Sequence, residues 1–536
     1  MLVHTASFLG KGVVMQGNVG MAKALSAFIA KLLILSAFII ALPQAQSALA
    51  AKTSTADHTK FKELDGPFET GPQVTKACLS CHTEAAKQVH KTKHWTWQFK
   101  NPDTGQLLGK RNVVNNFCIS TQSNIKGCSV CHVGYGWTDN TFDFAAEDKV
   151  DCLVCHDTTG TYDKKRLREG KRVKLDKIAQ NVGKTSRTSC GACHFKGGGG
   201  KAVKHGDLDP SFEAPDTFVD VHMDADGLNF SCSTCHTTDA HMVTGSRYTP
   251  KAKDTGGVDV PGKTDGSRAT CVSCHGERPM KDEKLNDHTD RVACQTCHIP
   301  HFARGDYPSK MWWDWSQAGK MNDKGKPFSL FDSEGNEIYN SKKGDFKWER
   351  DVVPEYRWFN GNVRYTLPTD KIDPTQVVEV NQFMGDADDP DALIWPIKLM
   401  RGKQPYDVGN KTMAIPHTVG KDGFWKTFDW QEAITKGMKA ASLPYSGEYG
   451  FVETEMSWPM AHMVAPAKES LQCEDCHAEN GRLADIDGIY LPGRDSNRWL
   501  DLGGFGILAL TAFSVTVHGA LRFFLNKRNG KSGKEG

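Results

Sequence analysis

Cys78-Leu79-Ser80-Cys81-His82 is the stretch that decides how this chain is organised, because its C-x-x-C-H pattern occurs eight times in 536 residues. Sixteen of the 17 cysteines belong to these copies, which we number motifs one to eight in chain order. Their first cysteines are Cys78, Cys128, Cys152, Cys190, Cys232, Cys271, Cys294 and Cys473. Their second cysteines are Cys81, Cys131, Cys155, Cys193, Cys235, Cys274, Cys297 and Cys476. Their histidines are His82, His132, His156, His194, His236, His275, His298 and His477.

The C-x-x-C-H pattern is the attachment signature of c-type haem. Two thiols three positions apart form thioethers with the two vinyl groups of one haem edge, and the next histidine then lies under the iron as its proximal ligand. The alternative is a set of cysteine redox pairs or half zinc sites, which would give no reason for a histidine after every second cysteine. We therefore predict eight covalently bound haem c groups as cofactors.

The spacing of the motifs sets the expected fold. Seven motifs lie between Cys78 and His298, which leaves little room for regular structure. We expect a mainly α fold with much irregular loop, organised around eight haems as a multihaem cytochrome c fold. Residues 51–300 form the haem-rich region, and residues 301–495 form a Trp-rich, haem-poor region with motif eight. The close pairs Cys128 with Cys152 and Cys271 with Cys294 are expected to bring neighbouring haems into near contact.

Most of the tryptophans, nine of 13, lie between residues 301 and 470, where no haem motif occurs. Trp312, Trp313 and Trp315 form one cluster. We interpret them as aromatic packing over the haem core; the alternative is a partner-docking surface or the wall of a substrate channel.

The two ends of the chain predict export and anchoring. Residues 1–50 contain lysines, an apolar run and a small-residue stretch ending at Ala50, as in a cleaved signal peptide; the alternative is an uncleaved signal anchor. Residues 499–525 predict a transmembrane helix, because Leu502 to Leu521 carry no charged side chain. The basic tail at 526–536 is then cytoplasmic, and the body faces the periplasm at the bacterial inner membrane.

Charge argues against nucleic acid as a partner. The whole chain has a net charge of only +2, and the basic residues of its two ends account for that excess, so the body is mildly acidic.

Histidines outside the motifs supply the expected second axial ligands. His58 is set aside because it follows the signal peptide closely, and His518 lies in the span, where it either ligates a b-type haem of a partner or lines a helix contact. Methionines 223, 242, 460 and 463 are weaker alternatives. The predicted distal ligands are His90, His94, His222, His241, His288, His301, His417 and His462.

Several segments beyond the motifs resemble the octahaem tetrathionate reductase family, over about residues 60 to 480. They are Asn115-Asn116-Phe117-Cys118 before motif two, residues 151–157, residues 190–195, and Lys204-His205-Gly206-Asp207. The C-terminal span lies outside the resemblance.

The resemblance implies seven bis-histidine haems and a different second haem, whose distal ligand is a lysine at the position of Lys204. A lysine ligates iron only when neutral, so burial and the metal must displace its proton. The family has an acidic residue three positions earlier, where this chain has Lys201; Asp207 or Asp209 are the substitutes we consider for proton delivery. His205 is expected to support the site without binding iron.

Cys118 is the cysteine outside the motifs, and the resemblance places it beside the active haem. Tetrathionate has a central S–S bond, which a thiolate can attack as in disulfide exchange. The alternative is an inert buried thiol.

We therefore expect a membrane-anchored periplasmic oxidoreductase that takes electrons from a membrane quinol donor or a cytochrome b-type subunit. Its small oxyanion substrate, tetrathionate, is reduced to thiosulfate at the haem of Lys204, with Lys201 helping to hold the dianion. The alternatives are a nitrite or hydroxylamine reductase, or a hydroxylamine-oxidoreductase-like enzyme, on the same scaffold. A third reading is an electron-transfer relay without catalysis.

Overall fold

The computed structural model describes residues 56–117, 119–245 and 269–532, with side chains described to residue 526. The predicted signal peptide and Cys118 therefore lie outside the described residues. The helices and helical turns are η2 (His58–Lys60), η3 (Lys62–Leu64), α2 (Gly71–Leu79), α3 (Ala85–His90), α4 (Lys93–Thr96), α5 (Ile125–Cys128), η4 (Ser129–Cys131), η5 (Glu147–Lys149), α6 (Leu153–His156), α7 (Lys164–Arg168), α8 (Leu175–Gln180), α9 (Arg187–His194), η6 (Pro210–Glu213), α10 (Cys232–Cys235), α11 (Val272–His275), α12 (Glu283–His288), α13 (Cys294–His298), η7 (Trp315–Gln317), α14 (Phe424–Thr427), α15 (Trp430–Ala440), η8 (Ala467–Glu469), α16 (Cys473–Cys476) and α17 (Arg498–Ser532).

The strands fall into one large sheet and three small hairpins. They are β1 (Phe99–Lys100), β2 (Leu107–Leu108), β3 (Val114–Asn115), β4 (Ile119–Ser120), β5 (Thr238–Asp239), β6 (Met242–Val243), β7 (Ser309–Asp314), β8 (Ser329–Phe331), β9 (Glu337–Asn340), β10 (Gly344–Glu349), β11 (Glu355–Phe359), β12 (Val363–Tyr365), β13 (Val378–Phe383), β14 (Leu393–Asp407), β15 (Thr412–Met413) and β16 (Tyr449–Pro459).

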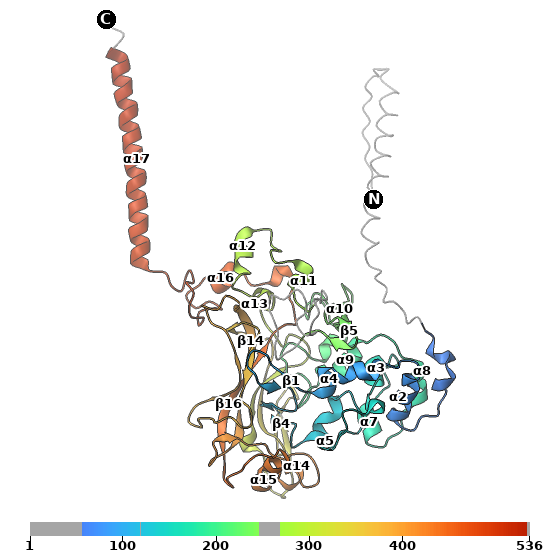
Figure 1. The fold of residues 1–536 in the computed structure, drawn as a ribbon. Coiled ribbons are helices and arrows are strands. Elements are labelled where there is room, and N and C mark those ends of the chain that lie inside the picture. The colour runs from blue at the N-terminus through green and yellow to red at the C-terminus, as the bar shows by residue number, and fades with distance from the viewer. Residues whose placement is uncertain (1–55, 118, 246–268, 533–536) are drawn as a thin grey trace, which may run out of the picture. The chain divides into compact units, whose positions relative to one another are not determined.

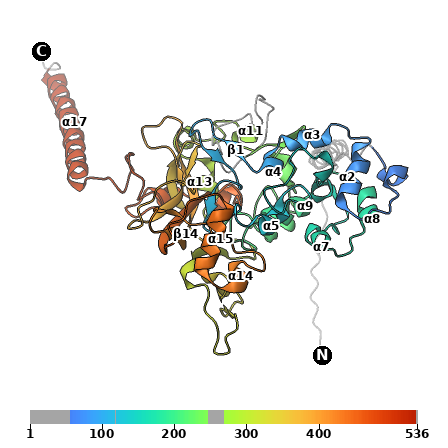
Figure 2. The same cartoon turned by 60° about the horizontal axis from the view of Figure 1, so that its bottom comes forward.

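The haem-rich region contains short helices separated by irregular loops, as the density of motifs predicts. No described helix between residues 56 and 300 is longer than α2, which has nine residues. Figures 1 and 2 show these helices, coloured blue to green, gathered beside the yellow-to-orange strands of the large sheet.

The prediction of a mainly α fold is wrong for residues 301–495, because ten strands between Ser309 and Pro459 form one sheet. Its strand order is β12-β13-β16-β14-β7-β10-β9-β8, and both β11 and β15 pair with β14. The long pair β14 and β16 is antiparallel and runs in register from Ile397–Pro459 to Asp407–Tyr449. β14 is buried along most of its length, so its side chains do not alternate between apolar and polar as an exposed strand would.

Two tryptophans of the cluster pack inside this sheet region and Trp312 is half-buried, which agrees with a packing role, while packing over the haem core stays a prediction. Trp313 and Trp315 are fully buried and stack with ring centroids 4.9 Å apart. Trp313 also donates a hydrogen bond to the Lys343 carbonyl at 2.7 Å. Large aromatic rings of this kind supply much of the apolar area that a core buries.

Two loops of the haem-rich region are attached to β14 by hydrogen bonds. The β3–β4 hairpin is held by Asn116, which donates to the Met400 carbonyl at 2.7 Å, and by Gln404, which donates to the Asn115 carbonyl at 2.9 Å. The loop before Lys204 is held by Lys398, which donates to the Val203 carbonyl at 3.0 Å. The sheet therefore fixes the two segments that the sequence singles out around Cys118 and Lys204.

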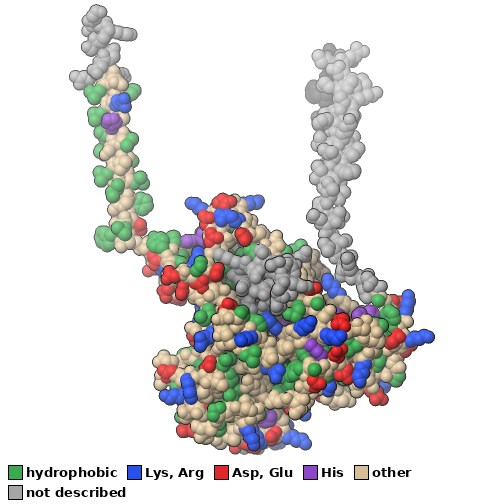
Figure 3. Space-filling view, viewed as in Figure 1, with side chains coloured by type: hydrophobic (Ala, Val, Ile, Leu, Met, Phe, Trp, Pro, Cys, Tyr) green, Lys and Arg blue, Asp and Glu red, His purple; other side chains and the backbone are tan. Residues whose placement is uncertain are grey.

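The C-terminal helix α17 matches the predicted transmembrane span. Its candidate span is Arg498–Asn526, in which an 18-residue stretch has a mean hydropathy of 1.7 and is not buried by other described parts of the chain. Hydrophobic side chains line it in Figure 3. Its length and composition are sufficient to cross a bilayer, and the helix continues to Ser532, into the predicted basic tail.

Candidate haem centres and active site

Most of the motifs fold as one turn of helix, which explains their spacing. In motifs one, three, five, six and eight the histidine N–H donates to the carbonyl of the first cysteine, four residues earlier. One helical turn places residues i and i+3 on the same face, so both thiols point to one haem edge. The bonds are His82 to Cys78, His156 to Cys152, His236 to Cys232, His275 to Cys271 and His477 to Cys473, at 2.8–3.1 Å.

Thiols of different motifs also meet. Neighbouring thiols connect motif one to three, two to four, four to five and six to seven; the pairs are Cys78–Cys152, Cys131–Cys193, Cys190–Cys232 and Cys271–Cys294. Motifs six and seven thus lie as close as their spacing in the sequence suggests. Motifs two and three do not pair in this way, because each finds its thiol partner in another motif.

Six motif histidines face a second imidazole at a nearly constant distance. Ring centroids within these pairs are 6.0–6.4 Å apart. The pairs are His82 with His58, His156 with His241, His194 with His94, His236 with His462, His275 with His222 and His477 with His288.

This distance fits an iron atom bound between the two rings. Imidazole nitrogens bind metals at about 2.0 Å, and the ring centre lies about 1.1 Å behind the nitrogen, so two axial imidazoles have centres about 6.2 Å apart. The spacing of the rings in these six pairs therefore fits two axial ligands of one iron atom, and the ligand role of the motif histidines stays a prediction.

Hydrogen bonds to Nδ1 orient several of the paired imidazoles in a way that favours metal binding by Nε2. In five of the paired histidines Nδ1 is bonded to an oxygen, which leaves Nε2 for a metal. The Nδ1 partners are the Gly183 carbonyl for His156, the Thr244 carbonyl for His236, Gln88 Oε1 for His241, the Lys284 carbonyl for His288 and Asp207 Oδ2 for His462.

The pairs include five of the eight predicted distal ligands, and His58 is one that the sequence reasoning missed. His58 was set aside for its position near the N-terminus, yet its ring stacks opposite His82 at 6.4 Å. The other three predicted ligands, His90, His301 and His417, are not in these pairs, and the ligand role of all eight stays a prediction.

These three histidines have other neighbours. His90 stacks on Trp95 at 4.5 Å. His417 Nδ1 lies 2.6 Å from the Ser123 carbonyl, and His301 Nε2 lies 3.4 Å from a guanidinium nitrogen of Arg482.

Motif two differs from the other motifs in backbone and in surroundings. Ser129–Cys131 is a 3₁₀ turn, and the His132 N–H bonds to the carbonyl of Ser129, three residues earlier instead of four. The His132 ring faces no second imidazole among the described residues. Its Nε2 lies 2.6 Å from the Trp95 carbonyl, and burial lowers its pKa to about 3.

Aromatic rings enclose His132 on several sides. Those within 6.0 Å between centroids belong to Trp95, Trp97, Trp137, Phe142 and Phe144. The proximal histidine of motif two is therefore buried in an aromatic environment.

Lys204 lies in the neighbourhood of motif two. Its ammonium is 5.9 Å from the ring centre of Trp458, and a Cβ added at Gly197 would be 3.5 Å from Nζ, so the glycine run gives the side chain room. A hydrogen bond from Cys193, together with the charges of Lys110, Lys204 and Lys164, lowers the pKa of the Cys131 thiol to about 5. Three lysine charges thus act on this motif.

The β3–β4 hairpin approaches the same place. The Phe117 ring packs against Gly198, where a Cβ would be only 2.1 Å from it, and lies 5.9 Å from Trp458. Ile119 has a φ of +64°, an unusual backbone conformation for a β-branched residue. Such conformations cost energy and gather at functional sites. The role predicted for Cys118 falls on a residue outside the described ones.

The other predicted catalytic residues have definite partners. Lys201 is exposed and donates to the Tyr307 hydroxyl at 3.1 Å. Asp207 is buried and accepts from the backbone N–H groups of Ala461 and His462 and from His462 Nδ1, at 2.8, 3.0 and 3.2 Å. Burial lowers the pKa of His462 and the bond to Asp207 raises it, with a net upward shift. Asp207 thus supports His462 in its pair with His236.

His205 also has a neighbour that the sequence reasoning did not name. Its ring meets Trp458 edge-on, with centroids 5.0 Å apart.

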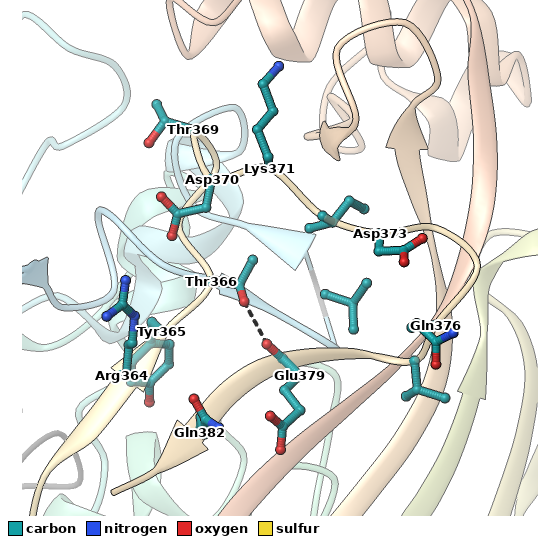
Figure 4. A pocket seen from close by; sticks show the side chains of 13 residues that line it. Arg364, Tyr365, Thr366, Thr369, Asp370, Lys371, Asp373, Gln376, Glu379 and Gln382 are labelled. Atoms are coloured by element: carbon teal, nitrogen blue, oxygen red, sulfur yellow. Dashed lines mark hydrogen bonds between the residues drawn. The ribbon is translucent and has the colours of Figure 1, made fainter.

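A large cavity among the described residues lies away from the motifs, and a smaller one adjoins motif two. The larger, about 610 Å³, lies between Arg364 and Gln382 and contains no motif residue (Figure 4). The smaller, about 190 Å³, is lined by residues that include Arg111, Thr121, Ile125 and Trp137. Ile125 and Trp137 pack against Cys128 and Cys131, so this cavity lies beside motif two. The described residues that line it include no acidic side chain.

Comparisons with known proteins agree with this architecture. Residues 310–480 match the family described as Cytochrome c bacterial. A crystal structure of octaheme cytochrome c from Shewanella oneidensis matches with a TM-score of 0.72 and 45% sequence identity, over 81% of this chain and 96% of that chain. No curated protein matches. The identity and the coverage place this chain in the octahaem cytochrome c family of multihaem c-type cytochromes.

Proposed function

We propose that the chain is a membrane-anchored octahaem reductase that converts tetrathionate to thiosulfate at motif two, on the periplasmic side. Six motif histidines face a second imidazole, whereas His132 of motif two and His298 of motif seven face none among the described residues. The observation that carries the proposal is that motif two, of these two, also has Lys204 and other lysines acting on its cysteine Cys131. A metal between two imidazoles has no open position, whereas an amine such as Lys204 is more easily exchanged. Haem bound at the motifs supplies one-electron redox chemistry.

The remaining motifs form the electron supply in this proposal. The neighbouring thiols group motif one with three, motif two with four and five, and motif six with seven. A charge interaction between Cys155 and Cys190 joins motif three to motif four. Charge interactions extend the series from motif five to six and from seven to eight, through Cys235 with Cys271 and Cys297 with Cys476. The electrons come from a membrane quinol donor or a cytochrome b-type subunit.

The charges near motif two suit a dianion. Lys110 and Lys204 act on Cys131, as does Lys164, which forms an ion pair with the buried Asp151 at 3.3 Å. The adjoining cavity holds Arg111 without an acidic lining residue among those described. Cationic groups in a site screened from water attract anions strongly. Lys201 lies near Lys204 in the sequence and adds a further exposed cation.

The reaction needs electrons but no net proton. Two electrons break the central S–S bond of tetrathionate, and each half leaves as thiosulfate. In the thiol route the Cys118 thiolate attacks one sulfur, releases the first thiosulfate and holds the other half as a mixed disulfide. Two electrons then break that bond, which releases the second thiosulfate and restores the thiolate.

Proton demand separates tetrathionate from the nitrogen substrates. Reduction of nitrite or hydroxylamine consumes protons, which requires an acid near the substrate. Lys201 occupies the position where the resemblance implies an acid, and Asp207 is bonded to His462. These two observations favour tetrathionate as the substrate. The test below includes nitrite and hydroxylamine as the competing substrates.

Export and anchoring complete the proposal. Residues 1–50 act as a signal peptide, α17 crosses the inner membrane, and the basic tail after it stays in the cytoplasm. The haem-bearing body is then held near the quinol pool.

The test is turnover of tetrathionate, nitrite and hydroxylamine by the purified, chemically reduced full-length protein. Wild type should be reoxidised fastest by tetrathionate, Lys204→Ala should lose most of that rate, and the exposed control Lys196→Ala should keep it. Faster reoxidation by nitrite or hydroxylamine would mean that the site reduces that oxidant and not tetrathionate. If none of the three oxidants reoxidises the protein, the chain is an electron-transfer relay without catalysis.

A further inference from the structure

A short segment connects two places where side chains meet the motifs. Residues 202–207, which we call the Lys204 strap, carry Lys204 near motif two and end at Asp207, which holds His462 opposite His236. Ala202 has a φ of +53°, so the strap begins with a turn that an L-residue seldom adopts. A segment with such a backbone conformation keeps it only when residues from other parts of the fold hold it in place.

Lys398 of β14 provides these contacts from the sheet. Its side chain is fully buried, and Nζ donates to the Val203 carbonyl at 3.0 Å and to Ser309 Oγ at 2.5 Å. Ser309 Oγ in turn donates to the Ala202 carbonyl at 3.0 Å. Lys398 thus fixes the carbonyl directly before Lys204, and through Ser309 the one before that.

The side chain of Lys398 also touches the strap beyond Lys204. A Cβ added at Gly206 would be 2.3 Å from the Phe302 ring and 3.1 Å from Lys398 Cδ, so the strap lies against both side chains at this glycine. Lys398 therefore meets the strap on both sides of Lys204.

A lysine is a costly residue for this place. Burial of an ammonium loses its hydration, and an apolar residue would pack in the core of a sheet without that cost. Burial lowers the pKa of Lys398 to about 7, against the opposing charges of Asp207 and Glu349. An apolar residue could not donate hydrogen bonds to the Val203 carbonyl and the Ser309 hydroxyl, which Lys398 does.

We propose that Lys398 is a positioning residue for the reaction: it clamps the strap so that the amine of Lys204 is presented to motif two in one place. This rests on the proposed function, because it assumes that Lys204 acts at that motif. The clamp predicts that Lys398 and Ser309 act as one unit.

The test uses the full-length haem-loaded protein and the variants Lys398→Met, Ser309→Ala and the double variant. Electron paramagnetic resonance should show that the one haem signal lost in Lys204→Ala is weakened or heterogeneous in each single variant. Loss in kcat/KM for tetrathionate should be about 10-fold, as for groups that orient metal ligands, and should fall mainly on kcat. The double variant should lose no more than Lys398→Met, since both changes break the same clamp.

The control is Asp407→Asn, which removes another buried charge from β14. Asp407 accepts hydrogen bonds from Ser446 and Asn410, away from the strap, so that variant should keep the haem signal and the rate. Ser309→Ala removes only one hydroxyl and serves where Lys398→Met fails to fold.

The outcomes separate this inference from the proposed function. If Lys204→Ala changes one haem and the clamp variants change none, the clamp is wrong and the proposed function stands. The clamp is also wrong if Asp407→Asn causes the same loss. If Lys204→Ala changes no haem, the proposed function fails and the clamp fails with it.

Discussion

Asp207→Asn is the perturbation that tests the imidazole pairs most sharply. Asp207 Oδ2 accepts two backbone N–H groups and Nδ1 of His462, whose ring faces His236 at 6.3 Å. Asparagine has nearly the same shape and keeps one acceptor oxygen, but it removes the negative charge. We expect the fold to survive and the haem that His236 and His462 hold to change its reduction potential.

The magnitude follows from the hydrogen bond. A bond to a charged acceptor contributes about 1 kcal/mol more than a bond between neutral groups. A carboxylate that withdraws the Nδ1 proton makes His462 a stronger donor and favours oxidised iron. With about 59 mV for each tenfold change in a one-electron equilibrium, the loss of about 1 kcal/mol raises the potential by about 40 mV.

Spectroelectrochemical titration with electron paramagnetic resonance resolves individual haems and measures this shift. One haem should move upward, and the others should keep their potentials. Asp209→Asn is the matched control, because Asp209 is equally buried but caps η6 through the Ser211 N–H at 2.7 Å. An unchanged potential in Asp207→Asn, or an equal shift in Asp209→Asn, would refute the reasoning.

Three further predictions follow from other parts of the molecule. His58→Ala should convert one haem, that of His82, from low to high spin in magnetic spectra; a fully low-spin spectrum would exclude His58 as its ligand. A chain that ends before Arg498 should leave the membrane fraction with its haem spectrum unchanged, whereas retention in membranes would contradict the anchor. Trp313→Ala should lose about 3–5 kcal/mol of unfolding free energy in guanidinium titrations followed by circular dichroism. Trp499→Ala, on an exposed side chain, should lose almost none, and equal losses would contradict the packing account.

The sequence predicts those features that depend on local chemistry. The C-x-x-C-H spacing fits one helical turn, and the uncharged run from Leu502 to Leu521 forms part of one long helix. Elimination also selects five histidines whose rings lie opposite motif histidines, because few histidines remain after the motifs are counted.

The sheet could not be predicted in this way. β14 contains Pro396, Lys398, Arg401 and Pro405 in a strand buried over most of its length, so neither alternation nor composition marks it as a strand. Its burial comes from neighbours on both faces, which local sequence does not reveal.

The partners of the motif histidines also depend on the folded chain. His236 meets His462 across more than two hundred residues, and no local pattern links them. His58 was missed because position near the N-terminus was taken to mean lack of a structural role, although η2 places it against motif one. The support of Lys204 by Lys398 is likewise a tertiary contact.

The most direct test of the account compares the oxidised wild-type protein with Lys204→Ala by near-infrared magnetic circular dichroism, which reports the axial ligands of low-spin haem. We predict bis-imidazole bands together with one weaker band of imidazole–amine ligation, and the variant should lose only the latter. A spectrum of bis-imidazole bands alone, or an amine band that persists without Lys204, would contradict the claim that motif two holds an exchangeable iron.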